Sequence, residues 1–528
     1  MDLVVFFPND FYDFEEGDEK PPPVGLMEWL ALVHNQSLEK IGIRVQRLKE
    51  RGLVEDVDMG AQEVYMHDLY REFAKLEASG KLKDLDFEER KWAYYKKSYP
   101  TELLEMMPSR GGWQNLTRVG VVDDWSIEGR SLSLEGIEWT SLSNVVVLKL
   151  CETGGSDLKG LRCLKSLELV NYNPRNTLDG LQDLKHLVYF KWDWFGDCIE
   201  VFLGKLPASL KVLRLNGDVI SLGSGIFDLC SNLAKLELRN CGAGNLDFRN
   251  CSSLQRLELW GLHHVLEGVS EMSLDGLQFL SKLTVFRWKH FDGMGVEVWV
   301  DFEGKSYHRL QCQLPESLQV LEIDENVSLR SDVFARCTKL GKVYLRYCHA
   351  ESLDLRNCKS LHIVKLVKVK WLRTLLGLSS SAATLKTLKV YGCDSLDGIP
   401  GLDQLVGLES LYLQNLRVNR NLRLSDLGCL TNLEELHLDG SDVELREEDV
   451  CVLASLPRLN PVGVVVGMGM YGKFRVDVKR RKVLKSDPRC RRWEKWEKCK
   501  KWEERELGEL LVSCGTVEVW DTGDFAPP

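Results

Sequence analysis

The chain has 528 residues, of which 44% are apolar and 28% are charged, and its formal net charge at pH 7 is −10. This composition is typical of a folded protein, and the acidic balance argues against binding to nucleic acid. No apolar run approaches the ~18 residues that a membrane helix needs, and residues 1–8 lack the basic start of a secretory signal. We therefore expect neither secretion nor stable membrane insertion.

Residues 1–80 predict part of a winged-helix unit, in which helices flank a two-stranded wing. The spacing of apolar residues in 38–48 is helical, and Gly52 follows where a helix ends. The first expected elements are a helix at 26–33 and an amphipathic helix with Leu38, Ile41, Val45 and Leu48 on one face. Strands at 53–54 and 64–66 follow, around a turn at 56–60. Asp68 then caps a last helix, whose apolar face holds Leu69, Phe73 and Leu76.

A basic stripe lies opposite the apolar face of the 38–48 helix. It consists of Lys40, Arg44, Arg47 and Arg51. Some winged helices place such a helix in the DNA major groove. The acidity of the whole chain favours the other interpretation, a solvated or domain-docking face.

Residues 81–112 are charged and aromatic without a clear period, and we interpret them as a connector that is helical around residues 88–97. From there on, a short phrase of the form L-x-x-L-x-L recurs fourteen times. Its first positions are residues 116, 145, 164, 187, 210, 233, 254, 283, 318, 340, 361, 385, 408 and 433. Most steps are 19 to 25 residues, which is the leucine-rich-repeat period.

The repeats predict an α/β leucine-rich-repeat solenoid (horseshoe) over residues 113–460. The step that follows Leu283 is the longest and holds an inserted island near residues 291–314. A solenoid of this kind presents a long binding face and no ready-made reaction centre. No Ser/His/Asp or Cys/His arrangement has a supporting local motif, so we do not expect an enzyme.

The 16 cysteines follow the repeat register. Cys241, Cys348 and Cys393 each come three residues after the last apolar position of the phrase, and Asn326 takes the same place in another copy. A second recurrent position, three residues before the first leucine, holds Cys230, Cys251, Cys337 and Cys358. Such cysteines are expected to be reduced packing residues, and the absence of C-x-x-C pairs argues against zinc. We expect a cytoplasmic protein, with the nucleus as the alternative compartment.

The variable positions of each phrase point away from the core because strand side chains alternate. Tyr, Trp and Arg dominate protein interfaces, and five of them mark the predicted partner-binding surface: Trp260, Tyr344, Arg346, Tyr391 and Tyr412. The alternative is that outward columns of any repeat protein carry such residues by chance. Trp192 and Trp288 occupy leucine positions, which predicts core packing.

Residues 461–528 break the repeat register and are expected to form a C-terminal cap. Residues 464–466 and 474–478 alternate like a closing hairpin. A highly charged helix with Trp493, Trp496 and Trp502 follows. A polar cap keeps a solenoid soluble, and this interpretation is favoured over a membrane-surface helix.

Met66, His67 and Asp68 form one sharp motif, placed after a predicted strand and at the start of a helix. The motif resembles the MHD motif of plant nucleotide-binding leucine-rich-repeat (NB-ARC, NLR) immune receptors. Its surroundings are similar too: Lys49-Glu50-Arg51-Gly52-Leu53-Val54 precedes it, Leu69 to Ala74 follow it, and the repeats begin a few dozen residues later. The resemblance spans nearly the whole chain and implies that residues 1–80 are the end of the winged-helix (ARC2-like) domain. In that family the histidine contacts the β-phosphate of ADP, a role that falls here on His67 and suits a helix N-terminus. The alternative is that His67 and Asp68 only cap a helix.

The nucleotide-binding motifs of that family would all precede residue 66, and the 65 residues before the triplet contain none of them. Residues 303–306 end like a phosphate-binding loop, but Trp299 replaces its required first glycine. We therefore expect no cofactor for this chain alone, whereas the complete family binds ADP or ATP. The resemblance implies the C-terminal part of an immune receptor. Its repeats would recognise a pathogen effector or a guarded host protein and pack on a nucleotide-binding domain to autoinhibit it. The alternative is a stand-alone protein-binding adaptor without a switch.

Overall fold

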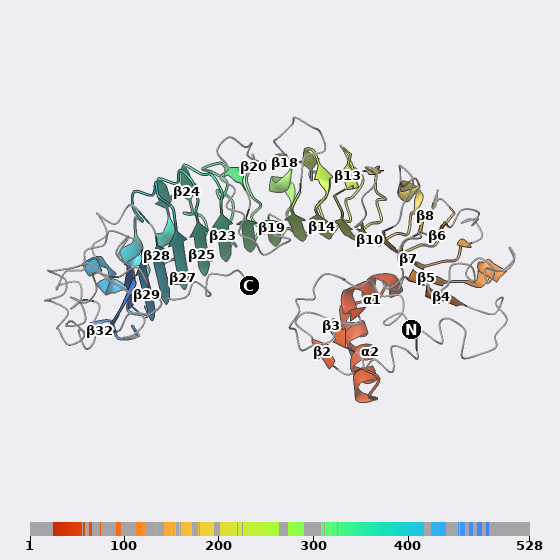
Figure 1. The fold of residues 1–528 in the computed structure, drawn as a ribbon, viewed down its shortest axis with the longest axis horizontal. Coiled ribbons are helices and arrows are strands. Elements are labelled where there is room, and N and C mark those ends of the chain that lie inside the picture. Colours follow the sequence, from red (N-terminus) through yellow and green to blue (C-terminus); the bar gives the residue numbers. More distant parts are fainter. Residues whose placement is uncertain are drawn as a thin grey trace, which may run out of the picture. The chain divides into compact units, whose positions relative to one another are not determined.

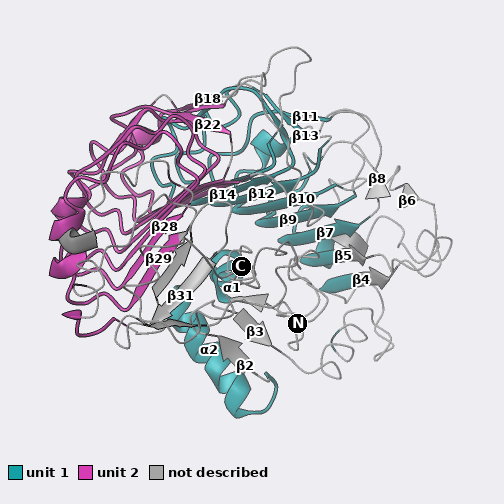
Figure 2. Cartoon of the chain, turned by 60° about the vertical axis from the view of Figure 1, so that its left-hand side comes forward, with its two compact units in different colours: residues 1–254, 259–267 teal, residues 255–258, 268–528 magenta. Residues whose placement is uncertain are grey.

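The computed structural model describes residues 25–54, 56–58, 63–65, 74, 91–96, 112–122, 132–133, 142–151, 153–154, 158, 160–171, 178, 180–194, 201–218, 220–223, 225–262, 273–289, 308–310, 312–324, 326–414, 416, 424–439, 452, 455–459, 464–467, 473–477 and 482–484. The chain divides into two compact units (Figure 2). Unit 1 is Met1–Leu254 with Leu259–Glu267, and unit 2 is Gln255–Glu258 with Gly268–Pro528.

Unit 1 begins with two helices and a small sheet. Its elements are β1 (Gly25–Leu26), α1 (Met27–His34), α2 (Leu38–Glu50), β2 (Asp56–Asp58) and β3 (Glu63–Tyr65). The sheet is antiparallel in the order β1-β3-β2. The side chain of Ser37 caps α2 by accepting from the backbone N–H of Lys40 at 3.4 Å. The predicted basic stripe on α2 is exposed.

The first strand of the wing lies later than predicted. Gly52 has φ +71°, and the backbone N–H of Leu53 donates to the carbonyl of Leu48 at 2.9 Å. This is the hydrogen bond of a Schellman motif, so Leu53 completes α2 and the strand starts only at Asp56. Ile41 and Val45 are buried as predicted, but Leu38 is exposed. The helix expected from Asp68, with Leu69, Phe73 and Leu76, lies outside the described residues.

The rest of unit 1 is a parallel sheet, here called the main sheet, whose strands lie side by side in chain order (Figure 1). They are β4 (Trp92–Lys96), β5 (Arg118–Val122), β7 (Val147–Cys151), β9 (Ser166–Val170), β10 (Tyr189–Asp193), β12 (Val212–Asn216) and β14 (Lys235–Arg239). The helix expected around residues 88–97 is wrong, because β4 pairs with β5 as one more parallel strand. Ala93 is buried and Trp92 packs on the N-terminal core, so tertiary contacts override the local helical pattern.

Unit 2 continues the same plan. Its strands are β19 (Val285–Lys289), β21 (Val320–Asp324), β23 (Lys342–Arg346), β25 (Ile363–Val367), β27 (Thr387–Tyr391), β28 (Ser410–Gln414), β29 (Glu435–Asp439) and β30 (Val464–Gly467). All of these neighbours pair in parallel. The predicted closing hairpin is confirmed: β31 (Lys473–Asp477) pairs antiparallel with β30 and with β32 (Lys482–Leu484). The charged helix with Trp493, Trp496 and Trp502 lies outside the described residues.

Each of the fourteen phrases forms one strand, which begins two residues after the first apolar position of the phrase. The strand of the seventh phrase, β17 (Arg256–Trp260), is divided between the two units. The apolar positions of the phrase are the core, as in Leu233, Leu236 and Leu238, which are 1% exposed or less. The solenoid of leucine-rich repeats is thus confirmed, because one repeated pattern of buried leucines yields one repeated parallel strand.

A second row of short strands follows the main-sheet strands. Its members are β6 (Leu132–Ser133), β8 (Thr153–Gly154), β11 (Val201–Leu203), β13 (Ile220–Leu222), β15 (Gly242–Ala243), β16 (Leu246–Asp247), β18 (Ser273–Asp275), β20 (His308–Leu310), β22 (Val327–Leu329), β24 (Ser352–Asp354) and β26 (Thr374–Leu376). Strand β20 corrects the predicted island of residues 291–314. It pairs with β18 and β22, and Leu310 and Leu314 are buried, so residues 308–314 belong to the repeat.

Short 3-10 helices complete the coils. They are η2 (Gly112–Asn115), η4 (Leu181–Asp183), η5 (Leu277–Phe279), η6 (Leu378–Ser381), η7 (Leu402–Gln404) and η8 (Leu424–Cys429). Gly377 precedes η6 and has a φ of +82°. A Cβ atom at this position would lie 2.2 Å from the backbone N of Arg356, so no larger residue fits without a shift of the backbone. The predicted inward cysteines are buried and free. The thiol of Cys241, for example, donates to the carbonyl of Arg239 at 3.2 Å.

Candidate functional site

The outward face of the main sheet consists of the first, third and fifth residues of each strand. In β14, β19, β23, β25 and β27 these residues are half-buried, whereas the second and fourth residues are buried. The alternation follows from strand geometry. Strands β7, β9 and β10 differ, because all five of their residues are buried.

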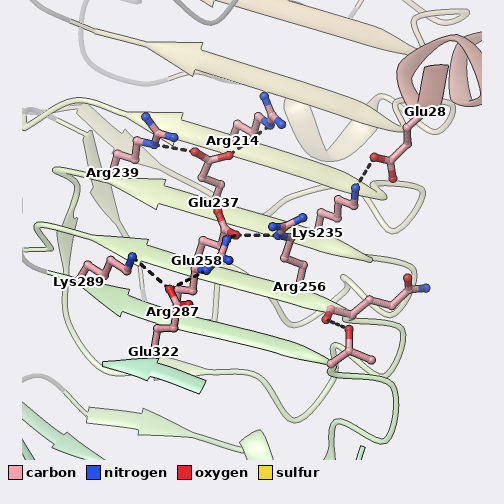
Figure 3. Close-up of polar contacts among 12 residues, drawn as sticks. Glu28, Arg214, Lys235, Glu237, Arg239, Arg256, Glu258, Arg287, Lys289 and Glu322 are labelled. Carbon is pink, nitrogen blue, oxygen red and sulfur yellow. Dashed lines mark hydrogen bonds and ion pairs between the residues drawn. The ribbon is translucent and has the colours of Figure 1, made fainter. Parts of the chain in front are cut away.

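Helix α1 covers part of the outward face in unit 1. The indole N–H of Trp29 donates to the hydroxyl of Ser166 at 2.9 Å, and Glu28 forms an ion pair with Lys235 (Figure 3). The apolar residues of α1 share one buried cluster with Val147, Tyr189 and Val212, the first residues of β7, β10 and β12. The N-terminal helices are therefore docked on the sheet by apolar burial and by specific polar contacts.

Four charged side chains on the third and fifth positions of these strands are buried as well. Lys149 and Glu168 lie 2.9 Å apart, Lys191 lies 3.9 Å from Glu168, and Lys191 lies 3.1 Å from Asp193. Burial raises the pKa of Glu168, against the opposing effect of the two lysines. Sequence analysis had placed these positions on an open outward column. They point outward, but they are covered and neutralise one another.

Farther along unit 1, Glu237 forms ion pairs with Arg214 at 3.3 Å and with Arg239 at 2.6 Å (Figure 3). The guanidinium of Arg239 lies 5.4 Å from the ring centre of Trp260. The predicted contact residue Trp260 is half-buried, and the cation–π contact with Arg239 helps to hold its ring in place.

Unit 2 begins with a second network of ion pairs on the outward face. Glu258 pairs with Arg256 at 2.7 Å and with Arg287 at 2.9 Å, and Arg287 also reaches Glu322 at 3.0 Å (Figure 3). Glu322 accepts further contacts from Lys289 at 3.1 Å and Lys342 at 2.5 Å. Burial tends to raise the pKa of Glu322, but the three cations outweigh it and lower this pKa to about 2. These carboxylates are saturated by the chain's own cations.

Beyond this network the third residues of the strands form a different row. In register, Tyr344 neighbours Lys365, Lys365 neighbours Lys389, Lys389 neighbours Tyr412, and Tyr412 neighbours His437. The ammonium of Lys389 lies 3.8 Å from the ring centre of Tyr412, which stacks on His437 at 4.1 Å. We call these five residues the tyrosine–lysine row.

The position of Tyr412 is fixed by its hydroxyl, which donates to Glu435 at 2.6 Å. Tyr344 at the other end is half-buried. Burial raises the pKa of its phenol, with Asp324 contributing in the same direction. Tyr344 therefore keeps its proton at neutral pH and can donate a hydrogen bond.

The end of β23 carries a second aromatic and cationic group. The guanidinium of Arg346 lies 3.3 Å from Asp324 and 4.8 Å from the ring centre of Tyr347, and Lys368 lies 5.3 Å from the same ring. Tyr347 and Lys368 have φ of 57° and 50°. Such values are unusual for large side chains. At the equivalent position, the residue after the strand, other repeats have Asn171, Asn240, Gly261 and Gly392.

The structure brings four of the five predicted contact residues together in unit 2. Tyr344 and Arg346 lie on β23, Tyr391 on β27 and Tyr412 on β28. Trp260 belongs to unit 1. The predicted switch motif, Met66, His67 and Asp68, lies outside the described residues. Trp192 and Trp288 are fully buried, as their leucine positions predicted.

The five predicted contact residues do not include two lysines that lie among them on the outward face. Lys365 and Lys389 stand at outward positions of adjacent phrases, and aligning the phrases places them side by side. The signal was thus present in the repeat alignment, as two cations in succession at the third strand position. Lys191 and Arg214 form another such succession, whereas Glu258, Arg287 and Glu322 alternate in sign.

In the described part of the chain no group of three or more His, Cys, Asp or Glu side chains is placed to hold a metal ion. Within the same residues no helix has the length and apolar character needed to cross a membrane.

No protein-family model matches the chain. Among solved structures it is similar to an internalin from Listeria monocytogenes, with 16% identity over 68% of this chain and 92% of that chain and a TM-score of 0.42. A leucine-rich-repeat protein from Leptospira interrogans is 17% identical over 72% of this chain and 97% of that one, with a TM-score of 0.46. A chain of the Toll–Spatzle complex of Drosophila is 16% identical over 70% of this chain and 53% of that one, with a TM-score of 0.44. The repeat geometry of the chain itself decides the fold. The chain has the leucine-rich-repeat fold.

Proposed function

We propose that the chain is a recognition protein that binds a protein partner through the outward face of strands β23 to β29. The observation that carries the proposal is the tyrosine–lysine row together with Arg346 and Tyr391. Tyrosine and arginine are enriched at the energetic centres of interfaces, because they combine a large apolar surface with hydrogen-bond donors. The outward positions of β23, β25 and β27 are half-buried, so part of each side chain is available for contact with a partner.

The finer proposal is that this protein is part of a plant immune receptor. Its repeats would recognise a pathogen effector or a guarded host protein and help to autoinhibit a nucleotide-binding switch. The resemblance of Met66, His67 and Asp68 to the MHD motif supports this. So does the docking of α1 on the outward face of the first repeats, since a contact of this kind can couple a sensing surface to a switch. The buried free cysteines of the described residues support a reducing, cytoplasmic location.

The recognition function is tested by capturing partners from host tissue with the purified full chain and with Tyr344→Ala. The control is Phe279→Ala, which removes another large aromatic side chain of unit 2 that is 58% exposed and lies on η5. We expect at least one protein whose recovery falls with Tyr344→Ala and not with Phe279→Ala. If the two variants recover every protein equally, the outward face of β23 to β29 is not the recognition surface. Thermal unfolding of both variants verifies that they fold.

The switch is tested separately with His67→Ala in a receptor that also contains a nucleotide-binding domain. Loss of an ADP contact should cause signalling without ligand. In a stand-alone adaptor the same substitution costs only local helix stability, about 1 kcal/mol or less. An unchanged signalling background would leave the adaptor as the remaining function, with its recognition surface intact.

A further inference from the structure

The exposed side of α2 carries apolar side chains next to its basic stripe. Leu38 and Ile43 are 43% and 50% exposed. With Met27 of α1 they line an open groove of about 640 Å³, here called the α2 groove. Its other lining residues all belong to α2: Glu39, Gly42, Gln46, Arg47 and Glu50. Exposed apolar side chains that gather in one groove indicate a surface that another segment covers.

The basic stripe borders this groove. Lys40, Arg44, Arg47 and Arg51 are exposed, and their spacing of three or four residues places them in one row along the helix. Arg47 also lines the groove. Among the described residues none of these four side chains forms an ion pair. Helix α2 therefore combines an apolar groove with a row of cations that the described chain leaves unmatched.

One segment of the chain has the complementary chemistry. Residues 10–19 lie outside the described residues, and their sequence contains six carboxylates together with Phe11, Tyr12 and Phe14. Aromatic side chains gain from burial of their large apolar surface, and carboxylates form charge-assisted hydrogen bonds with Lys and Arg. This composition matches both halves of the α2 surface, the groove and the stripe.

We infer that residues 10–19 dock in cis on α2, with their aromatic side chains in the α2 groove and their carboxylates against the basic stripe. Glu39 and Glu50 lie towards the two ends of the groove. The carboxylates of the segment therefore belong on the side of Arg44. A groove filled in this way is closed to other proteins until the segment leaves it. This contact is independent of the recognition surface on β23 to β29.

The connection to α1 is short enough to keep the segment at the groove. Seven residues, Lys20 to Leu26, separate it from Met27, which itself lines the groove. Three of them are consecutive prolines, and a linker of this kind spans ~3.1 Å per residue, or about 20 Å in all. The 13 residues of α2 span ~20 Å as well. A short tether gives a high effective concentration, so individually weak contacts are enough to hold the segment.

The apolar groove favours a protein segment over a nucleic acid. A row of cations also attracts phosphates. A phosphate backbone, however, gains nothing from the exposed side chains of Leu38 and Ile43, and the net charge of −10 opposes its approach. An acidic segment with aromatic side chains uses both the cations and the groove.

The first test is crosslinking of the full chain with a carbodiimide, which joins an amine to a carboxylate that it contacts. Crosslinked peptides of the monomer are identified by mass spectrometry. We expect a crosslink between Lys40 and a carboxylate of residues 10–19. Lys20 follows the segment directly in the sequence, so its crosslinks to the segment provide the reference for the yield.

Ile43→Gln is the test variant, because it changes the groove without a change of charge. The matched control is Leu229→Gln, at another position of unit 1 that is 48% exposed. The Lys40 crosslink, relative to that of Lys20, should fall about five-fold or more in Ile43→Gln and less than about two-fold in the control. The exposed pair Arg44→Gln with Arg47→Gln should lower it as well. Thermal unfolding verifies that each variant folds.

The second test probes the groove with a fluorescein-labelled peptide that has the sequence of residues 9–20. The variant Phe11→Ser with Tyr12→Ser and Phe14→Ser removes the aromatic side chains of the tethered segment and leaves its charge unchanged. In fluorescence anisotropy the peptide should bind this variant about ten-fold more tightly than the wild type, whose groove is already filled. A peptide with serine at the same three positions should bind the variant at least about ten-fold more weakly.

The inference is overturned if Lys20 reacts and Lys40 does not, or if Lys40 is joined to the segment only in crosslinked dimers, which would make a second copy the occupant. Equal binding of the two peptides would reduce the contact to general charge and would also overturn it. A labelled DNA duplex that binds the wild type, and loses affinity in Arg44→Gln with Arg47→Gln while the Lys40 crosslink is absent, would assign the stripe to nucleic acid instead.

Discussion

Replacing Glu322 by glutamine should destabilise unit 2 more than any comparable change at a surface ion pair. The carboxylate contacts Arg287, Lys289 and Lys342 at 2.5 to 3.1 Å, and its side chain is only 6% exposed. The pKa of Glu322 falls from 4.5 to about 2. At ~1.4 kcal/mol for each pKa unit, the ionised form gains about 3 kcal/mol on folding. Since glutamine still accepts hydrogen bonds, we expect Glu322→Gln to cost about 2 to 3 kcal/mol at neutral pH.

The dependence on pH separates this network from ordinary packing. The pKa of Glu322 is lower in the folded state, so its stabilisation is complete above about pH 4.5 and is lost as the pH falls towards 2. Urea unfolding of the wild type and Glu322→Gln, followed by circular dichroism, should show a difference at pH 7 that closes across this window.

The control is Glu409→Gln, which removes the same charge from the ion pair with Lys386. Those side chains are 39% and 43% exposed, so the expected cost is ~0.5 kcal/mol or less. The reasoning is refuted if Glu409→Gln costs as much as Glu322→Gln, or if the Glu322→Gln difference stays constant between pH 7 and 2.

Three further outcomes follow from the packing. Gly377→Ala should cost more than about 2 kcal/mol because its Cβ would overlap the backbone of Arg356, whereas Gly398→Ala, with open space around it, should be nearly neutral in thermal unfolding. The native chain can be labelled with iodoacetamide and the labelled cysteines located by peptide mapping. The exposed Cys163 and Cys429 should react before the buried Cys230 and Cys251, because burial raises the pKa of the two buried thiols to about 12. Equal labelling rates would contradict the burial of Cys230 and Cys251. Trp29→Phe should leave the buried hydroxyl of Ser166 without its donor and speed hydrogen exchange in α1, and an unchanged exchange rate would show that this bond does not hold α1 on the sheet.

Much of the fold is determined locally, and sequence therefore predicts it well. Each L-x-x-L-x-L phrase fixes which side chains turn inward, and a strand begins two residues after each first position because neighbouring coils bury the same leucines. The cysteine positions followed from the same register. Where prediction failed, a contact from elsewhere in the chain decided the outcome: β4 forms by pairing with β5, and Leu53 closes α2 instead of starting a strand.

The outward face shows more clearly what the sequence alone does not predict. The sequence by itself determined which residues point outward, including Tyr344, Lys365 and Lys389, because strand alternation is a property of the backbone. Only the tertiary structure decided which of them are buried. Docking of α1 on the first repeats accompanies the burial of Lys149 and Glu168, although α1 lies far from both in sequence. Glu322 takes its cations from the neighbouring strands β19 and β23. Burial and charge pairing depend on contacts between distant segments, and a local pattern contains no record of them.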